Sequence, residues 1–173
     1  MRNYLYHLYR QMESMLSDSS CNGKVILETH IGNSSFLLQK AKVLSPSSLY
    51  IFCDPQYEVI AREKKLLDAL DRQLNTMCIV SNYQVFPLER GCVDFIIDYF
   101  QNTSFDLFTD GFVFPRWKRY LHQGSKLIGV FIDIPHNSRS AVKFKAIHPD
   151  CTPNMHSFED FKHSLKEHGF VIE

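Results

Sequence analysis

Two acidic residues near the start of the chain each end a short apolar run. Residues 24–28 read Lys-Val-Ile-Leu-Glu, and residues 48–54 read Ser-Leu-Tyr-Ile-Phe-Cys-Asp. A polar, turn-prone loop at 29–35 and a helical stretch lie between them. Strand, loop, helix and strand is a nucleotide-binding layout, in which the carboxylate after the second strand holds a ribose. The sequence therefore predicts one ligand between Glu28 and Asp54.

Two later apolar runs bring further polar residues to strand ends. Residues 78–80 lead to Asn82, and residues 92–97 lead to Asp98 and Tyr99. Open α/β sheets bind their ligands outside the carboxyl ends of the strands. Asp98 could there take a proton from a substrate that Tyr99 also faces, and the alternative is a purely structural strand end.

These runs resemble the class I S-adenosylmethionine-dependent methyltransferases from about residue 24 to the end of the chain. The first motif of that family is acid-x-Gly-x-Gly-x-Gly, and the aligned residues here are Glu28, His30, Gly32 and Ser34. Only the middle glycine is kept. The family uses glycines because its backbone approaches the methionine and ribose of the cofactor closely, so a side chain at His30 should crowd that approach.

The second and third motifs of the family match in order and spacing. Asp54 and Pro55 open the second motif, which continues into a helix carrying Ala61-Arg62. The third motif matches 78–82, and the family usually has an acid at the Asn82 position that meets the adenine amino group. The resemblance implies these site residues: Glu28, His30, Gly32, Asp54, Pro55, Asn82 and Tyr83 at the cofactor, and Asp98 and Tyr99 at the reaction.

Each assigned residue also has a plain structural interpretation. Asp54 could be the N-cap of the helix that starts at Tyr57. Glu28 could accept hydrogen bonds from loop amides instead of anchoring the methionine amino group, and Asn82 is common in turns without any ligand.

The fold class that follows is α/β: a Rossmann-like methyltransferase fold with a mostly parallel sheet flanked by helices. We expect one domain over 1–173, made of a leading amphipathic helix at 1–20 and a core at 24–173. Within the core we expect a helix over 57–74, broken pieces over 103–120, and a helix from Ser157 through Lys166 that ends at Gly169. The terminal strand hairpin of the family is truncated here, so a dimer mate could cover the sheet edge.

Composition limits the partners. Lysine plus arginine equals aspartate plus glutamate at 19 each, so no overall field would attract nucleic acid or an anionic membrane. No apolar run reaches the roughly 18 residues of a membrane span. The five cysteines are odd in number, and Cys53 and Cys78 lie inside strand runs, which favours a reducing, cytoplasmic location.

Two function hypotheses follow. The first is an S-adenosylmethionine-dependent methyltransferase of small molecules, for which no catalytic triad is needed because the cofactor carries its own leaving group. The second is a catalytically inactive methyltransferase-like domain that senses a ligand or dimerises, through the first helix or a sheet edge, within a regulatory protein.

Two other site classes find little support. His148, Asp150, Cys151 and His156 are the one cluster that suggests a metal, but their spacing matches no closed zinc pattern. A nicotinamide-linked dehydrogenase would need a Gly-x-Gly-x-x-Gly loop, which is also absent from the sequence.

Overall fold

The computed structural model of the protein describes most of the chain between 22 and 129 and a helix near the end. The described residues are 10–11, 13–14, 22–82, 85–98, 105–106, 111–112, 114–129, 138–139, 142–143, 146 and 158–172. The chain divides into two compact units, Met1–Tyr99 with Arg116–Val130, and Phe100–Pro115 with Phe131–Glu173. Each unit is described by itself, and a single domain over 1–173 stays a prediction.

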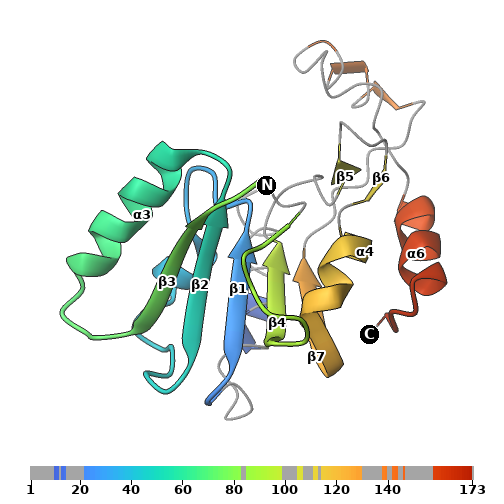
Figure 1. Ribbon diagram of the computed structural model, residues 1–173. Helices are drawn as coiled ribbons and strands as arrows, with labels where there is room; N and C mark the ends of the chain where they lie inside the picture. The colour runs from blue at the N-terminus through green and yellow to red at the C-terminus, as the bar shows by residue number, and fades with distance from the viewer. Residues whose placement is uncertain are drawn as a thin grey trace. The chain divides into compact units, whose positions relative to one another are not determined.

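A five-stranded sheet forms the centre of the first unit (Figure 1). Its strands lie in the order β3-β2-β1-β4-β7, and every pairing between neighbours is parallel. The strand bounds are β1 Val25–Thr29, β2 Leu49–Asp54, β3 Asn75–Val80, β4 Val93–Asp98 and β7 Leu121–Gly129. The mostly parallel sheet that the sequence predicts is confirmed.

The strand order places β1 at a topological switch point. The chain leaves β1 toward β2 on one side and later returns to β4 on its other side. Glu28 pairs in register with Phe52 of β2 and with Ile97 of β4. The carboxyl ends of β1, β2 and β4 therefore lie together, which is where open α/β sheets form their crevice.

Two helices connect the first three strands. α2 (Phe36–Gln39) is a single turn whose N-cap, Ser35, accepts the backbone N–H of Leu38 through its hydroxyl at 2.9 Å. α3 (Tyr57–Asp68) follows β2 directly. The predicted helix over 57–74 was too long, because β3 already begins at Asn75 and the chain needs the intervening residues to turn back to the sheet.

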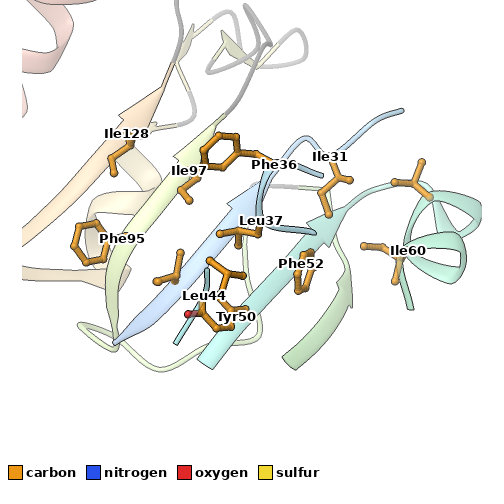
Figure 2. Packing of buried hydrophobic residues seen from close by; sticks show 12 residues of the cluster. Ile31, Phe36, Leu37, Leu44, Tyr50, Phe52, Ile60, Phe95, Ile97 and Ile128 are labelled. Carbon is orange, nitrogen blue, oxygen red and sulfur yellow. The ribbon is translucent and has the colours of Figure 1, made fainter. Parts of the chain in front are cut away.

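The hydrophobic core of the first unit lies between the sheet and these helices. Figure 2 shows Phe36 and Leu37 of α2 among side chains of the strands, and Ile60 of α3 near Phe52. The cluster consists of Ile26, Ile31, Phe36, Leu37, Leu44, Tyr50, Phe52, Val59, Ile60, Phe95, Ile97 and Ile128. Because side chains alternate along a strand, Leu27, Ile51 and Ile96 face the opposite side and are also buried.

Strand β7 contains a glycine, Gly124, where its pairing with β4 is irregular. Gly124 has φ +86°, a left-handed conformation that glycine adopts without strain. Val93 of β4 pairs with Leu121 of β7, and Phe95 pairs with Lys126. Between these two pairs β7 has more residues than β4, so the register of pairing shifts there. Beyond the shift, the two strands pair regularly up to Asp98 and Gly129.

The second unit holds short elements and one longer helix. β5 (Phe105–Asp106) and β6 (Gly111–Phe112) form an antiparallel pair, and α6 spans Phe158–Glu167. α6 ends as predicted, with Gly169 at φ +73°. α4 (Phe114–Trp117) begins in this unit and ends in the first, where the 3-10 turn η2 (Lys118–Tyr120) follows it.

The described parts agree with the predicted pieces over 103–120. Residues 170–172 are described and form no strand. Of the predicted leading helix, residues 10, 11, 13 and 14 are described and are helical, and Glu13 pairs with Lys40 at 3.0 Å.

Candidate functional site

The carboxylate at the end of β2 is held by backbone donors from two segments. Asp54 Oδ2 accepts the N–H of Gly32 at 3.1 Å, and Asp54 Oδ1 accepts the N–H of Gln56 at 2.9 Å. Gly32 has φ +54°, so this loop position requires the freedom of a glycine. The N-cap of α3 is Gln56, not Asp54. The Asp54 carboxylate therefore links the end of β2 to the loop after β1.

The carboxylate at the end of β1 binds the start of α2. Glu28 Oε1 accepts the N–H of Phe36 at 2.6 Å, and Oε2 accepts the N–H of Leu37 at 3.0 Å and the hydroxyl of Ser35 at 2.6 Å. Burial raises the pKa of Glu28 to about 7, a shift that these three donors reduce and the charge of Glu63 increases. The interpretation of Glu28 as an acceptor of loop amides is the one that the contacts bear out.

The third strand end carries a buried histidine–aspartate pair. His30 Nδ1 lies 2.9 Å from Asp98 Oδ1, and the imidazole ring lies 6.0 Å from the Trp117 ring, centroid to centroid. His30 has φ +53°, in the left-handed region that residues other than glycine seldom adopt and that histidine, asparagine and aspartate tolerate best among them. The hydroxyl of Thr29 also reaches Asp98 Oδ1, at 3.5 Å. Side-chain contacts thus join the ends of β1 and β4.

All four ionisable side chains at this edge are buried. Glu28 is 1% exposed, Asp54 and Asp98 are 3% exposed, and His30 is 6% exposed. Charged groups are seldom buried to this extent unless they are paired or hydrogen-bonded, since leaving water costs free energy. The edge is therefore a polar network inside the protein.

An arginine of α3 extends this network. Arg62 Nη2 donates to the carbonyl of Gly32 and to Glu63 Oε1, both at 2.6 Å. The charged run at 62–65 predicts a solvated helix face, but Glu63 within it is only 1% exposed, so that prediction is wrong for this residue. The helical spacing does indicate that Glu63 is buried, because it is four residues after Val59 and three after Ile60, both of which are buried.

The remaining predicted site residues are less tightly integrated. Pro55 and Asn82 are exposed at the ends of β2 and β3. Tyr83 and Tyr99 lie outside the described residues, as do His148, Asp150, Cys151 and His156. The structure thus brings together Glu28, His30, Gly32, Asp54 and Asp98 from the predicted set.

Comparison with solved structures identifies the fold. A candidate methyltransferase from Bacillus halodurans superimposes with a TM-score of 0.73 at 13% sequence identity, over 95% of this chain and 69% of that one. A SAM-dependent methyltransferase from Aquifex aeolicus gives a TM-score of 0.69 at 15% identity, over 96% of this chain and 80% of that one.

A third structure was solved with the cofactor bound. Phosphoethanolamine N-methyltransferase 2 of Haemonchus contortus, in complex with S-adenosyl-L-methionine, gives a TM-score of 0.73 at 15% identity, over 96% of this chain and 37% of that one. No protein-family model and no curated protein matches the sequence.

The chain has the Rossmann-like fold of the class I S-adenosylmethionine-dependent methyltransferases, as the sequence predicts. Within the described part of the chain, no helix is both long and apolar enough to cross a membrane.

Proposed function

We propose that this protein is a methyltransferase-like domain that binds an adenosine-containing ligand but does not transfer a methyl group. The observation that carries the proposal is the contact of His30 Nδ1 with Asp98 Oδ1 at 2.9 Å. His30 stands where the resembled family has the first glycine of its cofactor loop. In this proposal, the imidazole takes up space that the family leaves for the amino-acid part of the cofactor.

The adenosine half of the ligand finds better support. Asp54 ends β2 at the position of the family's ribose-binding acid, and Gly32 keeps the left-handed loop conformation that brings backbone to this carboxylate. Exposed Asn82, at the end of the next strand, is within the same edge of the sheet and offers an amide to adenine. These residues fit a nucleoside.

The methionine half fits poorly. The backbone of His30 has φ +53°, and its imidazole contacts the buried carboxylate of Asp98. If the imidazole moved aside, Asp98 would lose this partner. A ligand's amino-acid group would have to displace His30 and offset that cost. We derive no methyl-transfer step for this chain.

The test compares three ligands that share adenosine and differ in the rest. Adenosine, S-adenosylhomocysteine and S-adenosylmethionine are titrated calorimetrically into the wild-type protein. We expect the three dissociation constants to agree within about threefold, because an excluded methionine contributes no binding free energy. S-adenosylhomocysteine binding that exceeds adenosine binding by about thirtyfold or more would contradict the closed site. No heat from any of them at concentrations that reveal a millimolar site would overturn the proposal altogether.

Two variants give the same experiment its controls. His30→Gly restores the family's glycine, so S-adenosylhomocysteine should then gain at least about tenfold over adenosine. His30→Asn serves the same purpose if the glycine variant unfolds, since asparagine tolerates the left-handed region and its side chain is shorter. Asp54→Asn should weaken all three ligands together.

A second function is favoured by a different observation. The second motif is intact in sequence, and its acid, Asp54, lies beside the loop after β1, where it accepts the Gly32 N–H. On this basis the protein would be a methyltransferase acting on a small molecule, with Asp98 taking the proton of the acceptor. Conversion of S-adenosylmethionine to S-adenosylhomocysteine in the presence of small-molecule extracts would support this function. Dimerisation through the first helix or a sheet edge stays a prediction.

A further inference from the structure

The backbone of Gly32 is held from two opposite sides. Its N–H donates to Asp54 Oδ2 at 3.1 Å, and its carbonyl accepts from Arg62 Nη2 at 2.6 Å. One contact comes from the end of β2 and the other from the second turn of α3. Gly32 has no side chain that could pack, so these two hydrogen bonds of its backbone hold it in place.

The guanidinium that holds Gly32 is itself oriented by a buried acid. Glu63 Oε1 accepts both Nε and Nη2 of Arg62, at 3.1 and 2.6 Å. Glu63 Oε2 is buried and has no hydrogen-bond partner within the described structure. A buried carboxylate with an unsatisfied oxygen lowers stability, so packing alone does not account for an acid at this position. Its orienting contact with Arg62 does.

We infer that Arg62 is a positioning residue that keeps the loop after β1 in its ligand-binding place. The inference rests on the proposed function, in which a ribose binds the Asp54 carboxylate. Ribose hydroxyls would compete with the Gly32 N–H for the same oxygens, and the contact from Arg62 does not depend on Asp54. Arg62 therefore keeps the loop in place when a bound ribose weakens the contact between Asp54 and the Gly32 N–H.

The first measurement needs no ligand. Amide hydrogen exchange of Gly32 and Ser34 is followed by NMR in the wild-type protein and in Arg62→Ala. We expect exchange at these two amides to rise at least about tenfold while exchange at Phe52, inside β2, stays unchanged. Arg62→Lys should resemble the alanine variant, because one ammonium cannot reproduce the fork that reaches Gly32 and Glu63 together.

The chain offers a matched control in Arg72. Its Nη1 donates to the carbonyl of Lys42 at 2.7 Å, so it is also an arginine bound to a loop carbonyl, but in a different loop. Arg72→Ala should leave exchange at Gly32 and Ser34 unchanged. If Arg62→Ala proves too unstable, the double variant Arg62→Ala with Glu63→Gln removes the unpaired buried charge and carries the same expectation.

The second measurement adds adenosine as the probe. Arg62→Ala should weaken adenosine binding at least fivefold, and Arg72→Ala should not change it. Unchanged exchange at Gly32 in both Arg62 variants would overturn the inference. Faster exchange in a protein whose wild type binds no adenosine would leave the positioning role in place and contradict the proposed function instead.

Discussion

The two ends of strand β4 each carry an aspartate paired with a histidine, in opposite surroundings. At the amino end, Asp94 Oδ1 lies 3.2 Å from His122 Nε2, with side chains 14% and 43% exposed. At the carboxyl end, Asp98 Oδ1 lies 2.9 Å from His30 Nδ1, with side chains 3% and 6% exposed. The two pairs have the same residue types but differ in their exposure to water.

This difference in burial decides what each pair costs in free energy. Asp94 also accepts the ammonium of Lys24 at 2.9 Å and the N–H of Val25 at 2.8 Å, so it ties the starts of three strands at the surface. Exposed pairs of this kind contribute little to stability and cost little to keep. A buried pair costs desolvation and depends on both partners. The pair at the carboxyl end of β4 is therefore the more costly of the two to keep.

The largest difference between the two pairs is expected when each histidine is replaced by alanine. His30→Ala should lower the free energy of unfolding by about 3 kcal/mol, because it leaves Asp98 buried with its charge less compensated. His122→Ala should cost less than about 1 kcal/mol, since water replaces the lost partner. Urea denaturation of the two variants measures both. Equal losses would mean that burial does not distinguish the pairs.

The stabilities contributed by Glu28, at the carboxyl edge of the sheet, and Asp94, at its amino edge, should also depend on pH in opposite directions. The pKa of Glu28 is raised by burial from 4.5 to about 7, so between these values the folded state holds a proton that the unfolded state has lost. Its stabilising contribution is full below pH 4.5 and is lost as the pH rises to about 7, a change of about 3 kcal/mol.

The variant Glu28→Gln removes the ionisable group and so isolates the pH dependence that Glu28 contributes to stability. The unfolding free energy of the wild type, relative to that of the variant, should fall as the pH rises across this range. A difference between the two proteins that stays flat with pH would show that Glu28 is ionised throughout in the folded state.

The smallest effect is expected at the amino end. Burial acts to raise the pKa of Asp94, but the donors Val25, Lys24 and His122 outweigh it and lower the pKa below its ordinary value. Its contribution is therefore present at neutral pH and is lost as the pH falls through the lowered pKa. Asp94→Asn should cost about 1 kcal/mol at pH 7 and nothing in strong acid, as measured by urea denaturation at both pH values.

The sheet was predictable because its information is local. Strands β1, β2 and β4 are short apolar runs bounded by turn residues, and Gly32 lies in the polar loop after β1. The end of α3 was not predictable to this accuracy, since Leu70 and Leu74 continue its apolar pattern beyond Asp68. The demand for a connection to β3 ended the helix there.

The site was predictable only in part, because its contacts join distant segments. Glu28 and Asp54 could be found as acids at strand ends, and so could Asp98. The pairing of His30 with Asp98 depends on the register that aligns Thr29 with Asp98 across β1 and β4, and nothing local in the sequence encodes it. The contact of Arg62 with Gly32 likewise joins a helix to a loop 30 residues earlier.

The register shift between β4 and β7 bears on how this sequence can change over evolution. Shifting a strand by one residue moves every side chain to the wrong face, so most strands do not tolerate a gained or lost residue. Here the extra length between Leu121 and Lys126 lies outside the regular pairing and contains Gly124, whose added side chain would meet no atom within 4 Å. Insertions and deletions in this stretch should be absorbed locally, which leaves the pairing of Ile128 and Gly129 with the end of β4 unaltered.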